Sequence, residues 1–434
     1  MPLKTNSGFC PDCGPATVNH HHAWWSAFID SLFIPLGGIF QWTNRNLSQV
    51  LLLLKPARFG LPFFKFLTWC RLGQLTTTLD DHDSLRTRAL WESADKLGVK
   101  LYQFRILNYP DAALMIANYG SNWRVFDSLP NPDLLPSPSS HWLDDKGQLR
   151  RYLTAAKIPM AAGGVFSDLT KAQEIFKRLR KPVITKPHLG SRSRHTTLDI
   201  NSESELIAGF QKAKQLSPWV IVEEELKGAV IRGTVISGHL VGVVRRDQPS
   251  ITGDGSHAVV YLIEQENQNP QRRGPIFHPI PIGEDLAQEL KLQNLTMETV
   301  PSKGQVVRLH PKMSRAFGAS PTELTAQIHP DNVVLFEKVA AVLAEALVGI
   351  DLIIEDITRS WQTQSQCGVI ECNGAPFIDL HHYPLFGPPN PVADYLWKKV
   401  FPELAGAAGD SLTSQEPIQA KKTSLRSSSP RSKK

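Results

Sequence analysis

The sequence predicts a mixed protein of the α+β or α/β class, built from two or three structural units. The 434-residue chain is 41% hydrophobic and 20% charged, which suits a soluble globular protein with a substantial core. Short apolar runs alternate with amphipathic segments over much of its length. A proline-rich stretch at Leu129–Ser140 cannot continue a helix or a central strand, so it separates an N-terminal unit from the rest.

The periodicity of each segment predicts individual elements. Ser84–Leu97 has a helical period and Val99–Phe104 reads as a short strand, which predicts an N-terminal α/β unit at 81–140; residues 1–80 give no clear pattern. Beyond the proline-rich stretch, helices are expected at Lys146–Ala156, at Lys171–Arg180, and from a Ser202/Glu205 capping box to Lys214. Strands are expected at Lys181–Pro187, Trp219–Glu223, Ala229–Ile236 and Leu240–Arg246.

Positive charge is concentrated at the C-terminal end. The formal net charge is +6, and residues 405–434 have almost no large apolar side chains. The basic residues of this segment are Lys421, Lys422, Arg426, Arg431, Lys433 and Lys434. Such a segment cannot bury enough surface to offset the entropy of ordering it, which predicts a disordered, solvated tail. The remaining body is close to neutral, so we expect no nucleic-acid partner.

The cysteines are few and irregularly spaced. Five cysteines in a chain of this length predict a reducing, cytoplasmic setting without a disulfide framework. Cys10-Pro-Asp-Cys13, followed by His20–His22, contains residue types that bind zinc. One C-x-x-C pair without a second pair is a weak signal, and the interpretation favoured from sequence is a solvated segment.

An apolar stretch at Ala23–Trp42 raises the question of membrane contact. It is interrupted by Asp30, Pro35 and a glycine pair, and it lacks a signal-peptide cleavage site. Packing against the body of the protein is therefore expected. A peripheral membrane protein anchored weakly by this stretch and the basic tail is the less favoured alternative. The run Val50–Leu54 is too short to span a bilayer.

Two polar clusters follow apolar runs late in the chain. Gly349-Ile-Asp351 ends one run, and Glu371-Cys-Asn373 ends another before Pro376. Residues two apart on a strand point to the same face, so Glu371 and Asn373 emerge together. Two carboxylates and an amide oxygen are hard oxygen ligands of the kind that Mg²⁺ binds. These residues predict a magnesium site, as transfer of a phosphoryl group from ATP would require.

The pattern Glu-x-Asn-x-x-Pro after a Gly-Ile-Asp strand resembles the metal signature of the ATP-grasp superfamily. The chain resembles, more closely, the ATP-grasp region shared by cyanophycin synthetase and bifunctional glutathione synthetase. The matching positions, in order, are Asp145, Lys146, Leu153, Lys186, Pro187, Val220–Glu223, Gly228, Arg232, Arg246, Gly253–Gly255, Asn267, Pro270, Arg272, Val300, Pro301, His329, Pro330, His381, Tyr383 and Pro384. The similarity runs from about Trp142 to Leu404, and its specificity lies in the order of many short matches.

The resemblance implies an ATP-grasp fold, in which two α+β subdomains at 141–225 and 226–404 sandwich ATP behind an N-terminal pre-ATP-grasp unit. It assigns the ATP phosphates to Lys146 and Lys186. The remaining nucleotide contacts fall to Glu223, Glu224, Glu225, Leu226 and Arg232, with Glu223 beside the adenine and the backbone from Glu224 to Leu226 reading the base. It assigns Mg²⁺, with Mn²⁺ as an alternative ion, to Asp351, Glu371 and Asn373.

Three features depart from the family pattern. The loop over the phosphates, glycine-rich in the family, reads Gly190-Ser-Arg-Ser-Arg-His195 and has lost most glycines. Val230 replaces an acidic residue that often contacts ribose. At the reaction centre His310 stands in place of an arginine, and two asparagines are missing. The missing positive charge is expected from Arg308, Lys312 or Arg315, and Arg246 adds a fixed positive charge; Arg246, Arg308, His310 and Lys312 are the candidate catalytic residues. Arg308 lies two residues before His310 and points to the same face if both are on a strand.

The function implied by the resemblance is an ATP-dependent carboxylate–amine ligase that forms an amide through an acylphosphate. The expected partners are small molecules, a carboxylate and an amine from the amino acids or short peptides, and a homo-oligomer stays open. The altered loop and reaction centre support one alternative, an ATP-binding protein that uses the fold as a sensor or scaffold with little ligase activity. The chain also lacks the Mur-ligase-like unit of cyanophycin synthetase and the cysteine ligase of the bifunctional glutathione enzyme.

Overall fold

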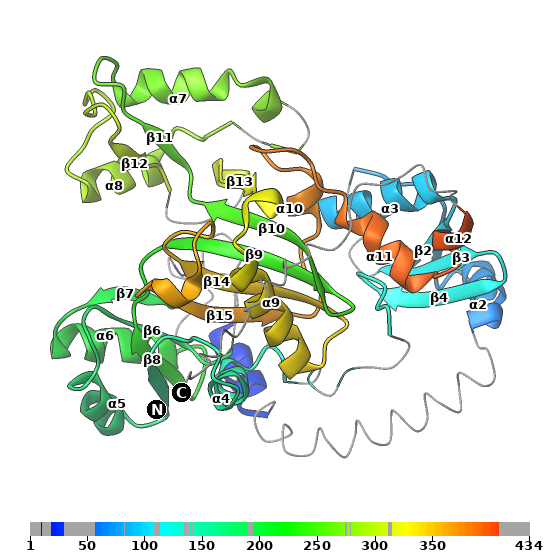
Figure 1. The fold of residues 1–434 in the computed structure, drawn as a ribbon, viewed down its shortest axis with the longest axis horizontal. Helices are drawn as coiled ribbons and strands as arrows, with labels where there is room; N and C mark the ends of the chain where they lie inside the picture. Colours follow the sequence, from blue (N-terminus) through cyan, green and yellow to red (C-terminus); the bar gives the residue numbers. More distant parts are fainter. Residues whose placement is uncertain are drawn as a thin grey trace, which may run out of the picture.

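The computed structural model describes most of the chain between residues 57 and 407, together with Cys10 and residues 19–29. The gaps within the main range are 82, 108–112, 134–136, 138, 140–141, 190–193, 274–275, 278 and 311–314. Figure 1 shows a central sheet with smaller units on either side and a further unit above it.

The central sheet has five antiparallel strands in the order β13-β10-β9-β14-β15. Their bounds are Ala229–Ile236 (β9), His239–Asp247 (β10), Ser320–Glu323 (β13), Leu347–Ile354 (β14) and Cys367–Asn373 (β15). Helix α9, Pro330–Leu343, packs on one face, and Phe336, Val339 and Ile350 belong to the shared core. Seven of the eight residues of β14 are buried, which explains its nearly unbroken apolar sequence.

A second antiparallel sheet, β5-β8-β6-β7, forms the unit at the lower left of Figure 1. Its strands are Gly163–Phe166 (β5), Val183–Pro187 (β6), Thr197–Ile200 (β7) and Val220–Glu224 (β8). Helices α5, Leu169–Phe176, and α6, Glu203–Lys214, cover it. The predicted capping box is confirmed: Ser202 accepts from the Glu205 amide, and Glu205 accepts from the Ser202 amide.

Helix α4, Lys146–Ala155, connects the two sheets. Asp145 caps it by accepting from the amides of Gly147 and Gln148. Leu149 and Leu153 are fully buried in the core of the five-stranded sheet, not in the core of the four-stranded sheet. The central subdomain predicted from residue 141 therefore begins with a helix whose buried side chains pack against strands that follow much later in sequence.

The N-terminal unit is an antiparallel meander, β1-β2-β3-β4. Its strands are Gly73–Thr76 (β1), Lys100–Ile106 (β2), Ala113–Tyr119 (β3) and Asn122–Asp127 (β4). Helices α2, Ala57–Trp69, and α3, Leu85–Leu97, flank the sheet. The predicted start at residue 81 is corrected here, since α2 and β1 belong to the same unit. Because neighbouring strands are consecutive in sequence, the unit is α+β, without the crossovers of an α/β sheet.

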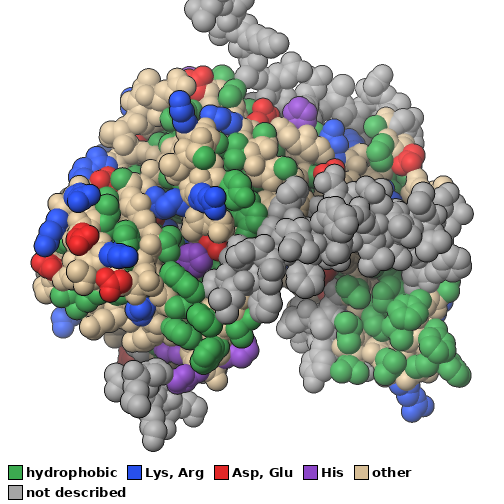
Figure 2. Space-filling view, turned by 90° about the horizontal axis from the view of Figure 1, so that it is seen from below, with side chains coloured by type: hydrophobic (Ala, Val, Ile, Leu, Met, Phe, Trp, Pro, Cys, Tyr) green, Lys and Arg blue, Asp and Glu red, His purple; other side chains and the backbone are tan. Residues whose placement is uncertain are grey.

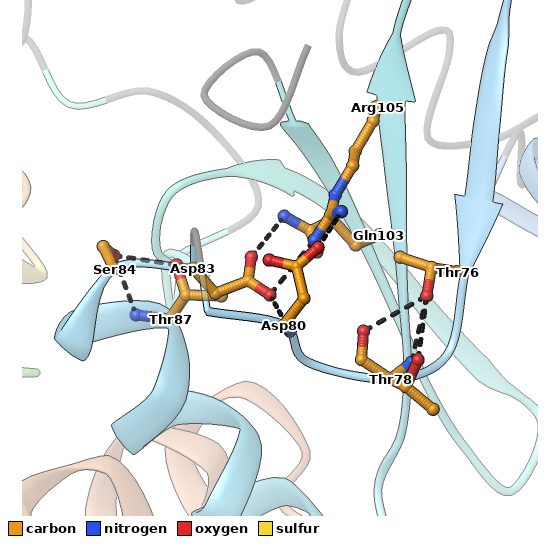
Figure 3. Close-up of polar contacts among 8 residues, drawn as sticks. All are labelled: Thr76, Thr78, Asp80, Asp83, Ser84, Thr87, Gln103 and Arg105. Carbon is orange, nitrogen blue, oxygen red and sulfur yellow. Dashed lines mark hydrogen bonds and ion pairs between the residues drawn. The ribbon is translucent and has the colours of Figure 1, made fainter. Parts of the chain in front are cut away.

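A buried arginine fixes the connection from β1 to α3 (Figure 3). The Arg105 side chain, on β2, donates to Asp80, and its Nη2 donates to Asp83 at 3.1 Å. Gln103 also donates to Asp83 at 3.0 Å. Ser84 then begins α3 by accepting from the Thr87 amide. Arg105 is only 8% exposed, so these carboxylates compensate a charge removed from water.

The N-terminal unit docks on the helices that follow the central sheet. These are α10 (Asp379–His382), α11 (Val392–Val400) and α12 (Leu404–Ala407). The fully buried Trp397 donates its indole N–H to the Leu90 carbonyl at 3.0 Å. Ser93 and Lys96 of α3 both bond Asp394, at 2.6 and 2.5 Å. The far side of the unit, at the right of Figure 2, carries exposed apolar side chains.

A separate small unit interrupts the central subdomain between β10 and β13. It contains the two-stranded sheet of β11 (Ser250–Thr252) and β12 (Val306–Arg308), with helices α7 (Val259–Asn267) and α8 (Glu284–Leu292). Ile251, Ile263, Leu290 and Val307 are part of its own core. It lies above the central sheet in Figure 1.

Part of the apolar N-terminal stretch is described as a helix at residues 20–29. Ala27 is 4% exposed, and the Phe28 ring stacks on Trp219 with centroids 6.2 Å apart. The described part thus packs against the body. Residues 30–42, the run Val50–Leu54 and residues 408–434 lie outside the described residues, whereas residues 405–407 of the predicted tail belong to helix α12. No helix in the described part of the chain has the length and apolar character needed to span a bilayer.

Candidate active site

The predicted acidic residues meet on neighbouring strands of the central sheet. In the register of β14 and β15, Asp351 lies opposite Glu371 and Gly349 lies opposite Asn373. Cys372, between the two polar residues of β15, is fully buried, while Glu371 and Asn373 are partly exposed. The alternation of the strand therefore places the two polar side chains on the open face, as the sequence predicts.

Asp351 is enclosed by two arginines. It lies opposite Arg232 on β9, and Arg232 Nη2 donates to Asp351 Oδ2 at 2.7 Å. Arg232 Nε donates to the other carboxylate oxygen, so the pair is bidentate. Arg246 Nη1 approaches Asp351 Oδ2 at 3.4 Å from β10. Asp351 is 2% exposed, and the two guanidinium groups supply positive charge beside its buried carboxyl group.

Arg232 lies below the surface that a nucleotide would contact. It is 3% exposed, and its Nη1 has no hydrogen-bond partner among the described residues. Gly349 makes room for it, since a Cβ there would lie 3.2 Å from Arg232 Nη1 and 2.8 Å from Pro376. The main partner of Arg232 in the described part of the chain is Asp351, and the prediction that Arg232 contacts the nucleotide stays a prediction. The Nη1 donor of Arg232, which has no partner among the described residues, is the group that can donate to a ligand.

Lys146 brings positive charge to the same place from the N-terminus of α4. Burial lowers its pKa, Glu371 and Glu223 raise it, and Lys186 lowers it. The lysine therefore lies within electrostatic reach of a predicted metal ligand on β15 and of the second predicted phosphate lysine. The packing of α4 on the central sheet explains this meeting of residues from two subdomains.

Lys186 is held by a buried carboxylate. Its Nζ lies 2.5 Å from Glu223 Oε1, and Arg150 of α4 bonds the other oxygen of Glu223. Glu223 is 4% exposed. Sequence predicts Glu223 beside the adenine; the structure adds a specific task, because Glu223 fixes both cations. Sequence analysis missed Arg150, whose position depends on how α4 packs against β8.

The segment after Glu223 is largely committed within its own sheet. The amides of Glu224 and Glu225 donate to the carbonyls of Ala162 and Pro182, at 2.8 and 2.9 Å. The Glu224 side chain bonds Arg180, and Glu225 bonds Lys227 at 2.6 Å. The prediction that backbone groups from Glu224 to Leu226 read the base stays a prediction, with these two amides already bonded within the sheet. Leu226 and the carbonyl groups of the segment are what it can present.

A histidine next to Lys186 was also missed. His188 Nε2 lies 2.6 Å from Oδ1 of Asp145, the residue that directly precedes Lys146. Burial alone would raise the pKa of Asp145, but its bonds with His188 and with the amides of Gly147 and Gln148 lower it. The contact links β6 to the start of α4. It therefore fixes the spacing of Lys146 and Lys186, and only the tertiary structure reveals it.

The predicted reaction-centre residues separate in space. Arg246 contacts Asp351, whereas Arg308 binds Glu289 of α8 at 3.1 Å and its side chain is 53% exposed. Arg308 lines a cleft of about 790 Å³ together with Arg245 and Asp247, which lie on the opposite face of β10 from Arg246.

His310 lies two residues beyond the end of β12, so the condition that Arg308 and His310 are both on a strand is not met. It is 6% exposed and stacks on Phe317 with centroids 3.9 Å apart. Arg315 binds Asp379 at 2.5 Å and two backbone carbonyls. Lys312 lies outside the described residues, as do Gly190 to Ser193 of the loop over the phosphates. Arg246 is the one predicted reaction-centre residue that the described part of the chain brings to the Asp351 cluster.

The residues present fit a divalent cation and a polyphosphate. Glu371 and Asn373 offer hard oxygens on one face, with Asp351 on the adjacent strand. Lys146, Lys186 and Arg246 supply positive charge around them, and Arg232 retains an unused buried donor. An anionic ligand with its metal ion complements both halves of this set.

Comparisons with known proteins agree with this arrangement. The chain is 30% identical over 262 residues to cyanophycin synthetase of a Nostoc species, covering 59% of this chain and 29% of that protein. It is 28% identical over 269 residues to a bifunctional glutathione biosynthesis protein of Streptococcus agalactiae, covering 59% and 35%. The chain thus spans about a third of the length of these relatives. No protein-family model matches the chain.

The fold has a counterpart among solved structures. A bifunctional glutathione synthetase from Pasteurella multocida superposes with a TM-score of 0.57 at 23% identity, covering 74% of this chain and 44% of that one. Together with the two antiparallel subdomains and the site between them, this defines an ATP-grasp fold. Within that fold, the sequence is similar to the corresponding regions of cyanophycin synthetase and bifunctional glutathione synthetase.

Proposed function

We propose that the protein is an ATP-dependent carboxylate–amine ligase that acts on amino acids or short peptides. The observation that carries the proposal is the meeting of Lys146 and Lys186 with Arg246, Asp351 and Glu371. Lys186 comes from the four-stranded sheet and Lys146 from the start of α4, and they are paired with Arg246, Asp351 and Glu371 of the five-stranded sheet. That pairing suits a magnesium nucleotide held between two sheets.

In the proposed reaction, a carboxylate oxygen of the first substrate attacks the γ-phosphorus of ATP. The bond from that phosphorus to the β-phosphate oxygen breaks, giving an acylphosphate and ADP. The amine of the second substrate then attacks the acyl carbon. The C–O bond breaks, phosphate leaves, and the nitrogen loses a proton to yield the amide.

Each charged residue has a role in this reaction. Lys146 and Lys186 bind the phosphates, and Glu223 keeps Lys186 pointed at them through its 2.5 Å contact. Arg246 stabilises negative charge on the transferring group, held there by Asp351. Glu371 and Asn373, with Asp351, would hold Mg²⁺, which when bound neutralises phosphate charge.

The buried Arg232–Asp351 pair bears on the metal assignment. Because Arg232 already bonds both oxygens of Asp351, we assign Glu371 and Asn373 as the principal metal ligands. Asp351 then acts mainly through the arginines it holds.

ADP release tests the proposal. The full chain would be assayed with ATP and Mg²⁺ across amino acids and short peptides, singly and in pairs. We expect amine-dependent ADP formation that disappears in Glu371→Gln. Glu355→Gln is the matched control, since Glu355 is an exposed glutamate that bonds Ser365 and the Gln366 amide. Tight ATP binding without turnover across the panel would favour a sensor or scaffold.

A further inference from the structure

Three side chains with sulfur or nitrogen donors, Cys10, His20 and His195, meet although Cys10 and His195 are 185 residues apart in sequence. Cys10 Sγ lies 3.6 Å from His195 Nε2, and the His20 ring stands edge-on to the His195 ring with centroids 4.8 Å apart. One donor atom from each residue lies within 4.8 Å of the other two. Histidine side chains also gather at one edge of the face shown in Figure 2.

The protonation of His195 can be read from its second nitrogen. His195 is 1% exposed, and its Nδ1 lies 2.9 Å from the Lys212 carbonyl on α6. A carbonyl only accepts hydrogen bonds, so Nδ1 carries a proton, and Nε2 is the ring nitrogen that faces Cys10. Metal-binding histidines typically donate their other ring N–H to a carbonyl or carboxylate in this way.

The spacing of the Cys10 and His195 donors also fits a bound ion. Zinc binds cysteine sulfur at about 2.3 Å and histidine nitrogen at about 2.0–2.1 Å with tetrahedral angles, which places those two donors roughly 3.6 Å apart. The Cys10 Sγ to His195 Nε2 distance is 3.6 Å. Thiolate and imidazole ligands select zinc over Mg²⁺, which takes oxygens.

We propose that Cys10, His20 and His195 bind a zinc ion, separately from the magnesium nucleotide site. The three side chains provide one sulfur and two nitrogens, which leaves one tetrahedral position for water or another ligand. Cys13, three residues after Cys10, lies outside the described residues, and the proposal does not rest on it. From sequence, zinc was a weak signal because one C-x-x-C pair stands without a second pair; His195, the third ligand, lies 185 residues from Cys10.

The ion would attach the N-terminal segment to the four-stranded sheet. His20 begins the helix at residues 20–29, whose Phe28 stacks on Trp219, and His195 precedes β7. This zinc site therefore adds a metal link to an aromatic contact at a second point on the same helix. Removing the metal is expected to release Cys10 for reaction and to loosen the helix without affecting the magnesium ligands.

Metal analysis of the full chain, with any affinity tag removed, tests the proposal. Purified protein should contain about one zinc ion per chain. Cobalt(II) added to the metal-free protein should give a thiolate-to-cobalt charge-transfer band and the intense visible bands of tetrahedral coordination. Cys10→Ser should lose the charge-transfer band, and zinc affinity should fall at least about tenfold.

Two further variants distinguish a ligand from a structural residue. His195 has a backbone φ of 53°, which glycine adopts freely, so His195→Gly removes the imidazole and relieves the backbone. It should fold and lose zinc. His22→Gln is the matched control, because His22 is exposed on the same helix, and it should bind zinc like the natural chain.

The alternative to a metal is a direct hydrogen bond between the Cys10 thiol and His195. Absence of stoichiometric zinc together with absence of the cobalt band would overturn the proposal. So would zinc retained unchanged in both Cys10→Ser and His195→Gly. Neither outcome depends on ligase activity, so the zinc site and the proposed function fail or stand independently.

Discussion

The buried pair between Arg232 and Asp351 allows a quantitative test of how the site is held. Both residues are almost fully buried, and Asp351 accepts two bonds from one guanidinium. Removing one partner leaves the other charge buried without compensation. That costs about 3–5 kcal/mol, whereas replacing both by apolar residues is often nearly neutral.

The perturbation is a double-mutant cycle of Arg232→Met, Asp351→Leu and the double variant. Each single change should lower the free energy of unfolding by about 3–5 kcal/mol. Asp351→Leu has the larger effect, because Arg246 also loses its contact at 3.4 Å. The double variant should be no worse than either single one, which gives a coupling energy of about 3 kcal/mol.

Urea unfolding followed by tryptophan fluorescence measures these energies, and equal slopes in all four proteins check that one transition is compared. Hydrogen exchange at the amides of β9 and β14 locates the effect. Single-variant costs below about 1 kcal/mol, or effects that add within about 0.5 kcal/mol, would refute the reasoning.

Three further predictions concern binding, catalysis and pH. Because burial lowers the pKa of Lys146 below 10.5, ATP affinity should fall as the pH rises through that lowered pKa. The Lys146→Arg variant should keep its ATP affinity over this pH range. A flat pH profile of ATP affinity in the natural chain would contradict the prediction. Arg246→Ala should lower turnover about 100-fold or more while Arg308→Ala stays within about threefold; steady-state kinetics that show equal losses would restore Arg308 to the reaction centre. Burial lowers the pKa of His382 to about 4, and its Nε2 accepts from the Ala393 amide. As the pH falls, the His382 imidazole is protonated in the unfolded chain before it is protonated in the folded chain. The free energy of unfolding should therefore decline between pH 6.5 and about 4, by at most about 3 kcal/mol. Unfolding measured across this pH range should show a flatter dependence in His382→Gln.

Local signals in the sequence predicted many elements of the fold. The Ser202/Glu205 capping box and the start of α3 at Ser84 depend on neighbouring residues, so sequence alone finds them. The strand Ala229–Ile236 was also predicted at its observed bounds. Such features require only periodicity and turn or cap chemistry.

Packing across the predicted unit boundaries at residues 81 and 141 has a physical cause. Helix α4 looks like the first element of its own subdomain, but Leu149 and Leu153 pack in the core of the central sheet. The start of the N-terminal unit was missed because β1 is only four residues long. Strand pairing and packing between distant segments are not encoded in local periodicity.

The candidate site divides in the same way. The pairing of Glu371 with Asp351 follows from alternation on two apolar strands. Arg150 holds Glu223, and His188 holds Asp145, through contacts between segments far apart in sequence. Arg308 was expected to point to the same face as His310 if the strand continued to His310, whereas the strand ends at Arg308.

Trapping the activated carboxylate tests the central claim most directly. The full chain would be incubated with ATP, Mg²⁺, candidate amino acids or short peptides, and hydroxylamine in place of the amine. An acylphosphate formed at the site would be captured as a hydroxamate. We predict ATP- and Mg²⁺-dependent hydroxamate from at least one carboxylate, lost in Glu371→Gln and kept in Glu355→Gln. Saturable ATP binding with no hydroxamate across the panel, or equal hydroxamate from Glu371→Gln, would contradict the account.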